Sequence, residues 1–288
     1  MTKYSVADIV SFLKVFTGLP ADKDELLLCR GHSDNSFFLC PPVLRDKKTA
    51  EDENSLYRQI MVEYPNKFMR NDHLGNLTIM QHYGTPTRLL DFTLNPLLAL
   101  YIASEERPDK DGQVVVCQVR KSEILHHTSD KALMLSCLPC LDQEDQNGIK
   151  AYCQGHRGRI RDENELKKHG AMWRFLHEIR RECPAFECEI VGEHLLNVYF
   201  VQPYKNNERI AIQSGLFALF GLADNDKAKH MLDEYVAATI DIKANGKREI
   251  LEQLRKMNIM SSTIYPDFER RAMDLVHKKA KWTGYLDD

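Results

Sequence analysis

The chain has 288 residues and a mass of 33.3 kDa, which is enough for one large domain or two small ones with a substantial hydrophobic core. Apolar residues make up 43% and charged residues 28%, a globular composition that excludes disordered, collagenous and low-complexity proteins. The formal net charge of −3 excludes a global positive field, so any nucleic-acid contact would need a local basic patch.

Targeting and membrane segments are not expected. Residues 1–20 carry Lys3, Asp8 and Lys14 among their apolar residues, unlike the unbroken apolar stretch of a signal peptide. No run of 18 apolar residues occurs, so the sequence predicts no membrane-spanning helix. We therefore expect a cytoplasmic protein without membrane contact, in which the eight cysteines are reduced thiols.

The apolar pattern mixes helices and strands without regular βαβ alternation. The expected helices cover 6–16, 51–69, 96–102, 164–181, 247–257 and 268–277. The expected strands cover 25–30, 88–92, 113–119, 197–202, 216–220 and 237–242. This pattern predicts a single α+β domain in which helices flank a curved mixed sheet.

Local signals set several of these boundaries. Ser5 is the expected N-cap of the first helix, and Pro65 should kink or end the second. Asn95-Pro96 is a strong helix start, because Asn caps and Pro suits the first turn. The polar residues 142–155 are expected to form a surface connection.

The densest group of functional side chains lies in residues 81–93, which supply an amide, an imidazole, a phenol, three threonine hydroxyls, a guanidinium and a carboxylate. Gly84 and Pro86 predict a turn inside this segment. The helix that starts at Asn95-Pro96 offers backbone N–H groups suited to an anion. The alternative is a structural loop, in which Arg88 and Asp91 pair with each other or with the backbone.

Two further groups are candidate sites. Arg30-Gly31 ends a predicted strand, where Arg can hold a phosphate or carboxylate and Gly allows a ligand close to the backbone. Glu208 and Gln213 precede another predicted strand, and Glu208 is a candidate acid, base or charge stabiliser. Alternatively, Arg30 pairs with a core carboxylate and Glu208 is simply solvated.

Cysteine spacing suggests a zinc pattern, Cys137-x2-Cys140 followed by Cys153-x2-His156. The first pair lies in the apolar segment 133–141, and Cys is often buried without a metal. Cys183-x4-Cys188 is a weaker pattern, and these two cysteines are interpreted as core thiols. No metal site is therefore predicted, and zinc binding by Cys137, Cys140, Cys153 and His156 is the alternative.

A basic stretch, residues 156–161 together with Lys167 and Lys168, could contact phosphate. Acidic residues interrupt it, and no aromatic side chains interleave to stack on bases. We therefore expect a solvated surface here and consider nucleic-acid binding unfavoured.

Taken together, several of these motifs resemble the FRG domain, which is named for a Phe-Arg-Gly motif near its start. The resemblance rests on Arg30-Gly31, Pro42-x-Leu44, Arg58, the Gln81-His-Tyr-Gly-x-Pro-Thr-Arg-Leu-Leu-Asp-Phe-Thr-x-Asn-Pro96 motif, Leu135-Ser-Cys-Leu-Pro139, 207–217 and 254–266. Cys29 stands where the family has Phe. The resemblance implies a helical extension at 1–23, an FRG domain at 24–278 and a tail at 279–288.

The order of motifs is also similar to ADP-ribosyltransferase-type folds, which implies NAD as the substrate. Those folds place an Arg or His on an early strand, a hydroxyl-bearing strand before a helix and an acidic residue before a late strand. The implied catalytic residues are Arg30, Asp91 and Glu208. The implied NAD-binding residues are Arg30, Gly31, Gln81, His82, Tyr83, Arg88, Thr93 and Gln213. Within this set, Arg30 and Arg88 would contact phosphate or ribose, and His82 or Tyr83 would stack on nicotinamide.

Three classes of function stay open. The first is an enzyme that uses NAD to transfer ADP-ribose to an acceptor macromolecule or to hydrolyse NAD. The second is a regulatory module that binds a nucleotide or another phosphorylated ligand without turnover. The third is a toxin or defence effector directed at nucleic acid, which would need a contiguous positive face.

Overall fold

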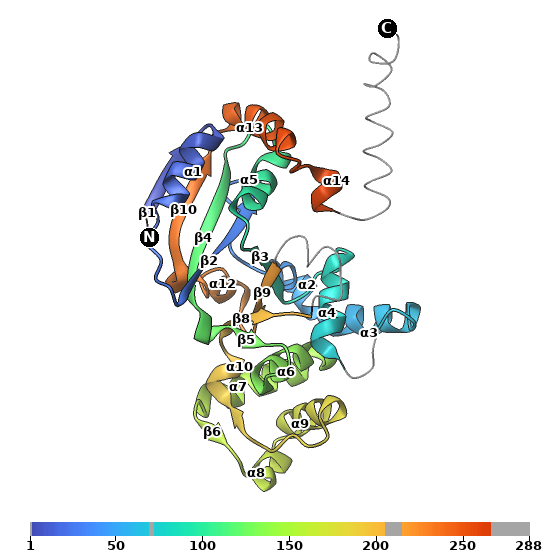
Figure 1. The fold of residues 1–288 in the computed structure, drawn as a ribbon. Helices are drawn as coiled ribbons and strands as arrows, with labels where there is room; N and C mark the ends of the chain where they lie inside the picture. Colours follow the sequence, from blue (N-terminus) through green and yellow to red (C-terminus); the bar gives the residue numbers. More distant parts are fainter. Residues whose placement is uncertain (1, 69–71, 205–214, 266–288) are drawn as a thin grey trace.

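The computed structural model describes residues 2–68, 72–204 and 215–265. Its central feature is an eight-stranded mixed sheet with the order β1-β10-β4-β2-β3-β9-β8-β5 (Figure 1). The strands are β1 Thr2–Val6, β2 Glu25–His32, β3 Leu89–Thr93, β4 Gly112–Arg120, β5 Leu125–His126, β8 Val198–Gln202, β9 Gly215–Phe220 and β10 Val236–Ile242. A separate ribbon pairs β6 Arg159–Ile160 with β7 Ile190–Val191.

Helices flank this sheet, so the predicted α+β class is confirmed. The longer ones are α1 Ile9–Thr17, α3 Glu53–Glu63, α4 His73–His82, α5 Pro96–Glu105, α6 Asp130–Cys137, α7 Gln143–Gly155, α9 Gly170–Glu182 and α13 Ala244–Lys256. The shorter ones are α2 Lys47–Glu51, α8 Glu163–Lys168, α10 Gly192–Leu195, α12 Asn225–Ala228 and α14 Ser261–Ile264, with 3₁₀ turns η1 Pro42–Leu44, η2 Lys121–Glu123, η3 Leu138–Cys140 and η4 Asp233–Tyr235.

The sheet is weakly joined in its middle. β2 is in antiparallel register with β4 along its whole length, whereas β2 and β3 share only the pair Cys29–Thr93. Beyond β3, the register with β9 is again continuous from Leu89 to Thr93. The sheet therefore consists of a first half-sheet (β1, β10, β4, β2) and a second half-sheet (β3, β9, β8, β5), which meet at what we call the seam.

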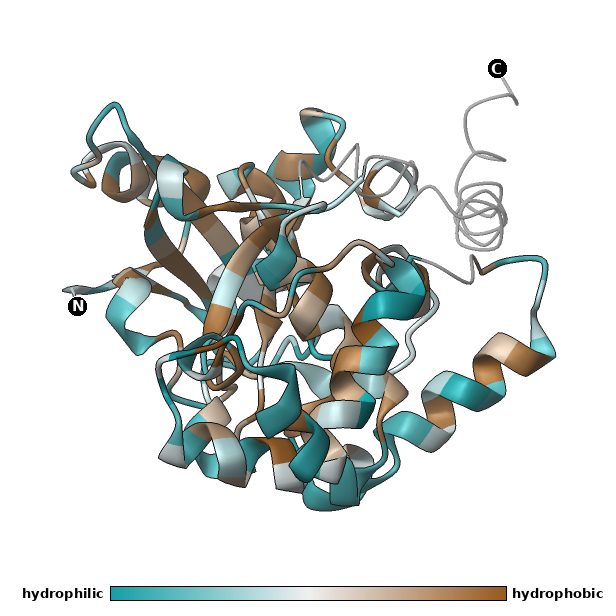
Figure 2. Ribbon diagram, turned by 90° about the horizontal axis from the view of Figure 1, so that it is seen from below, coloured by the Kyte–Doolittle hydropathy of each residue, from teal (hydrophilic) through white to brown (hydrophobic). Residues whose placement is uncertain are grey.

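Hydrophobic cores cover both half-sheets. α1, α5 and α13 pack on the first half-sheet, whereas α4, α6, α7 and α9 build a larger helical core beside the second (Figure 1). A third core lies on the opposite face, under η1 and α12. The strands are mostly apolar, while the helices carry apolar residues on one side and polar residues on the other (Figure 2). This matches the pattern expected when helices cover a buried sheet.

The beginning of the chain differs from the prediction. Residues 2–6 form an edge strand that pairs in parallel with β10, so the segment 1–23 is not purely helical. The N-cap of α1 is Asp8, whose carboxylate accepts the backbone N–H of Ser11 at 2.8 Å, and not Ser5. The prediction failed because five residues of edge strand are too short, and too polar, to show a clear period of two.

Two other segments need correction. Residues 142–155 are not a surface connection: Asp142 caps α7, which buries Ile149 and Cys153. The expected helix 164–181 is broken at His169, whose side chain caps α9, so α8 and α9 are separate. The expected helix 268–277 lies outside the described residues. None of the described helices is long and apolar enough to cross a membrane.

Candidate functional site

A small pocket opens at the seam, where the two half-sheets part. It is lined by Cys29, Arg30, Gly31, Asp91, Phe92, Thr93, Leu98, Ile102 and Tyr265, and its volume is about 180 Å³. Its walls are β2, β3, α5 and the residue that follows α14. The fold thus brings together four of the residues that the sequence singled out, Arg30, Gly31, Asp91 and Thr93.

Arg30 is held against this pocket by its neighbours. Its Nη1 donates to the backbone oxygen of Asp91 at 2.7 Å, and its Nε donates to Nε2 of His32 at 3.2 Å. Its Nη2 has no hydrogen-bond partner within the described residues. The Arg30 side chain is 17% exposed, and burial lowers the pKa of the guanidinium. A fixed cation with one open donor edge is suited to a phosphate or carboxylate.

His32 is a member of this group that the sequence analysis missed. Its side chain is buried, and because Arg Nε can only donate, Nε2 of His32 accepts and the proton lies on Nδ1. That buried Nδ1 has no hydrogen-bond partner among the described residues. The signal was available, because residues two apart on a strand share a face and His32 follows Arg30 by two.

The protonation of His32 predicts acid sensitivity. Burial, with help from the charges of Arg30 and Arg45, lowers the pKa of His32 to about 3. The unfolded chain binds this proton near pH 6.5, so the stability that neutral His32 contributes is present above pH 6.5 and is lost as pH falls toward 3. We expect the free energy of unfolding at pH 4.5 to be lower than at pH 7 by about 2–3 kcal/mol from this group alone.

Urea unfolding of the wild type and His32→Gln at pH 7 and pH 4.5 measures this effect. His32→Gln should be less acid-sensitive than the wild type, because Gln does not titrate but can still accept from Arg30. His126→Gln is the matched control, since that imidazole is exposed, and it should change nothing. Equal pH dependence in His32→Gln and the wild type would contradict a neutral buried His32.

Asp91 is tied to the C-terminal end of α4. Gln81 donates from Nε2 to Oδ2 of Asp91 at 2.9 Å and accepts the hydroxyl of Thr87 at 2.7 Å through Oε1. Nη1 of Arg30 lies 3.8 Å from Oδ2 of Asp91. The Asp91 side chain stays 42% exposed, so it combines a fixed position with access to solvent. Gln81 acts on the site through Asp91 and does not line the pocket.

The start of α5 differs from the expectation of open backbone N–H groups. Oδ1 of Asn95 accepts the N–H groups of Leu97 at 3.0 Å and Leu98 at 3.4 Å. The capping side chain therefore already uses the backbone donors that an anion would need. Thr93 is buried, and its hydroxyl accepts the N–H of Asn95 at 3.0 Å. The two residues fix the turn between β3 and α5.

Gly31 is required by packing. A Cβ at this position would lie 2.2 Å from the backbone oxygen of Ala99 and 2.8 Å from the backbone nitrogen of Ala103. β2 and α5 therefore touch through their backbones at the pocket wall. The space that the sequence analysis assigned to a ligand beside Gly31 is filled on this side by α5.

Arg88 is the clearest correction. Its side chain is 1% exposed and forms a buried two-point ion pair with Glu53, with Nη1 also donating to the backbone oxygen of Phe220 at 3.2 Å. It forms no ion pair with Asp91 and does not line the seam pocket. Arg88 therefore joins α3 to the second half-sheet and cannot reach phosphate or ribose without leaving the core.

The aromatic candidates lie beside the pocket's supporting helix. Tyr83 is 66% exposed at the end of α4, with its ring against His82 at a centroid distance of 4.8 Å and Lys67 5.8 Å from its centroid. Neither aromatic residue lines the seam pocket in this structure. Glu208 and Gln213 lie outside the described residues, so their predicted roles stay predictions.

The basic stretch and the cysteine pattern are also accounted for. Glu189 pairs with Arg159 at 3.6 Å and with Arg161 at 2.8 Å, and Lys167 lies 5.3 Å from the centroid of the Trp173 ring. These contacts interrupt the positive face that nucleic-acid binding would require. Separately, Cys137, Cys140, Cys153 and His156, the alternative zinc set, do not form a group of close metal-ligating atoms in the described part of the chain, and His156 stacks on Tyr152 instead.

Comparison with known proteins gives one family. The FRG domain model matches residues 26–112, which run from β2 to the first residue of β4 and include Arg30, Gly31 and the 81–93 segment. No curated protein and no solved structure matched the chain. The match confirms the resemblance drawn from the motifs within residues 26–112, and this part of the chain is similar to the FRG domain.

Proposed function

We propose that the seam pocket binds NAD and that the protein transfers ADP-ribose to an acceptor or hydrolyses NAD. The observation that carries the proposal is Arg30, a rigidly held and largely buried cation whose Nη2 is open at the pocket between β2 and β3. A charged donor left open at a pocket favours an anionic ligand. His32, which holds Arg30 through Nε2, does not line the pocket, but its buried Nδ1–H is a second unpartnered donor on the same strand.

The dimensions of the pocket suit part of the dinucleotide. About 180 Å³ is below the roughly 300–1,000 Å³ usual for whole small-molecule ligands, but has room for a single ring such as nicotinamide. The diphosphate would then lie outside, against the open edge of Arg30. A hydroxyl-bearing strand leading into a helix, here Thr93 before α5, supports the similarity to ADP-ribosyltransferase-type folds.

The chemistry needs few groups. The bond between ribose C1′ and the nicotinamide nitrogen breaks, nicotinamide leaves as a neutral base, and positive charge develops on the ribose, as in glycoside chemistry. The acceptor oxygen or nitrogen bonds to C1′ and gives its proton to a base. Glu208 is the proposed stabiliser of the ribose charge, and Asp91 is the second carboxylate candidate. The segment carrying Glu208 leads into β9, whose first residue, Gly215, pairs with Thr93 at the pocket wall.

A binding module without turnover is the second candidate. It is favoured by the state of Asp91, whose carboxylate already accepts from Gln81 and lies near the Arg30 charge. A carboxylate held this way supports a rigid ligand site better than it supports proton transfer. In this alternative, Arg30 and His32 bind the same phosphorylated ligand and Glu208 has no role. The nucleic-acid-directed alternative loses support because Glu189 neutralises Arg159 and Arg161.

Replacing Arg30 by Ala tests both candidates. We expect Arg30→Ala to weaken NAD binding about 10- to 100-fold, because a hydrogen bond to a charged group contributes about 1.5–3 kcal/mol. Arg120→Ala, which removes an exposed Arg from β4, is the matched control and should bind normally. Calorimetric titration with NAD measures affinity, and thermal unfolding checks the fold. Unfolding of Arg30→Ala would assign Arg30 to the core instead.

Turnover is tested with Glu208→Gln. Chromatography of NAD incubated with wild type should reveal free nicotinamide, and Glu208→Gln should release at least about 100-fold less while binding NAD equally. Release that needs cell extract would identify a transferase whose acceptor is in the extract. Binding without release in either condition would favour the binding module, and neither binding nor release would overturn the proposal.

A further inference from the structure

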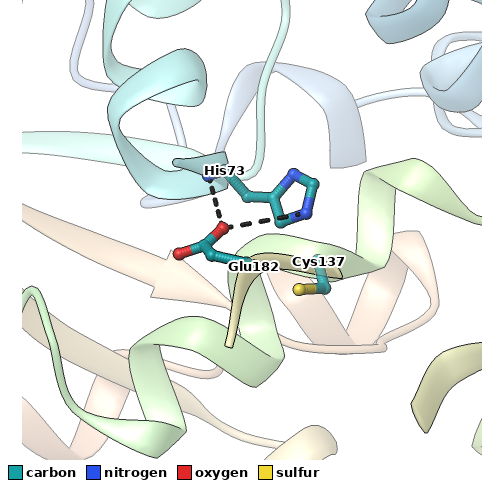
Figure 3. Close-up of side chains that lie close together, drawn as sticks. All are labelled: His73, Cys137 and Glu182. Atoms are coloured by element: carbon teal, nitrogen blue, oxygen red, sulfur yellow. Dashed lines mark hydrogen bonds and ion pairs between the residues drawn. The ribbon is translucent and has the colours of Figure 1, made fainter. Parts of the chain in front are cut away.

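A second polar cluster lies away from the seam, inside the large helical core. His73 is the first residue of α4, Cys137 the last of α6, Cys140 the last of η3 and Glu182 the last of α9. Figure 3 shows three of these side chains pointing toward one another from separate elements. None of the four lines the seam pocket. The ends of four helical elements thus bring nitrogen, sulfur and carboxylate groups together inside the core.

The distances are close to those of a tetrahedral metal site. One ligand atom each from His73, Cys137 and Glu182 lie within 4.8 Å of one another. Nε2 of His73 is 3.7 Å from Oε2 of Glu182. Cys140 lies outside this group of three: its Sγ is 3.3 Å from Nδ1 of His73 and 4.0 Å from Nε2. Zinc bonds of about 2.0–2.3 Å to N, O and S put tetrahedral ligands roughly 3.3–3.8 Å apart. Closing His73, Cys137 and Glu182 around an ion therefore takes shifts of about 1 Å, and Cys140 completes the set when its side chain turns from Nδ1 toward Nε2.

The second ring nitrogen is also suitably placed. Nδ1 of His73 lies 3.0 Å from the hydroxyl of Tyr57, so Nδ1–H can donate to that hydroxyl while Nε2 faces the carboxylate. Such an outer partner fixes the ring orientation of a metal-binding histidine. Glu182 is held as well, because its Oε2 accepts the backbone N–H of His73 at 2.7 Å. Its Oε1 has no hydrogen-bond partner among the described residues.

Burial of these groups is costly without a cation. The side chain of His73 is 8% exposed and that of Glu182 is 20% exposed, and Cys137 and Cys140 are both buried. A divalent ion would offset this cost, because it stabilises thiolate and carboxylate next to a neutral imidazole.

We propose that His73, Cys137, Cys140 and Glu182 bind a structural zinc ion. The mixed N, S and O donors suit zinc, and the Cys137-x2-Cys140 spacing is common in zinc sites. Four protein ligands in a buried position leave no place for a reacting water, so the ion ties α4 to α6 and α9. Because the last turn of α4 carries Gln81, which holds Asp91, the ion also anchors the helix behind the seam pocket.

Elemental analysis of the full-length protein tests the proposal. The protein purified without chelator should contain about one zinc ion per chain. His73→Gln and Cys137→Ser should lose that zinc. Cys153→Ser and His156→Gln, which alter a buried thiol and a half-exposed imidazole outside the cluster, should keep it.

A second measurement uses the wild type and does not depend on whether the variants fold. Cobalt added to the chelator-treated protein should give thiolate-to-metal charge-transfer bands, and removal of zinc should lower the thermal unfolding temperature. Absence of zinc, of the cobalt bands and of any chelator effect would overturn the proposal. A cobalt spectrum without thiolate bands would equally overturn it, because both cysteines are assigned as ligands.

Discussion

Glu53→Leu should lower the free energy of unfolding by about 3–5 kcal/mol. The substitution leaves the Arg88 guanidinium buried, with its charge no longer balanced by the carboxylate of Glu53. The remaining acceptors near it, the backbone oxygen of Phe220 and the side-chain oxygen of Gln146, are neutral. A cation cannot be hydrated at this position, so part of the protein must open to let water in. Urea unfolding followed by circular dichroism measures the change.

Two variants separate the unpaired charge from ordinary loss of packing. Glu53→Leu combined with Arg88→Met replaces both charges by apolar groups and should recover most of the lost stability. Glu51→Gln removes an exposed carboxylate that lies 3.6 Å from Lys47, and should change stability by less than about 0.5 kcal/mol. A double variant as unstable as Glu53→Leu would mean that the ion pair itself organises this core.

Gly31→Ala should destabilise the protein by about 3 kcal/mol or more. The added methyl would lie 2.2 Å from the backbone oxygen of Ala99, and no side-chain rotation can relieve a contact with backbone. α5 must therefore move away from β2, which also widens the seam pocket beside Arg30. The midpoint of urea unfolding is the direct measure, and NAD binding by the surviving folded fraction should weaken as well.

Gly158→Ala serves as the matched control, because nothing lies within 4 Å of the added methyl there. It should leave the urea midpoint unchanged within about 0.5 kcal/mol. If Gly31→Ala were equally harmless, then β2 and α5 would be separated by more than the structure indicates. The close backbone contact, and the narrow pocket that depends on it, would then need to be reconsidered.

The parts of the fold that sequence could predict carry their signals locally. β2 begins as an apolar run and continues through Arg30-Gly31 to His32. α5 begins at Asn95-Pro96, where the cap and the first turn are both encoded by neighbouring residues. The order Arg30, then Asp91 and Thr93, then a helix was therefore predictable. The seam that brings them together was not, because strand order depends on pairings between distant residues.

The failures at the candidate site have the same cause. Arg88 was expected to contact phosphate or ribose, with a pair to Asp91 as the alternative, but its partner Glu53 lies 35 residues earlier, on α3. Burial determines this partner. Arg88 directly precedes β3 and is buried in the core, where only a carboxylate can balance the charge of a guanidinium. The zinc alternative paired these cysteines, Cys137 and Cys140, with Cys153 and His156, whereas in the structure Cys137 lies near His73 and Glu182, and Cys140 near His73.

The two half-sheets interleave along the chain, and this shapes how the protein can fold during synthesis. Thr2 pairs with Ala238, so β1 emerges from the ribosome roughly 10–50 s before its partner β10. For that time, β1 is a strand without a neighbour, and the edge of β4 that β10 later covers is open too. An apolar strand left waiting would invite aggregation with other nascent chains. β1, with the sequence Thr-Lys-Tyr-Ser-Val, is polar enough to stay in water until the sheet can close.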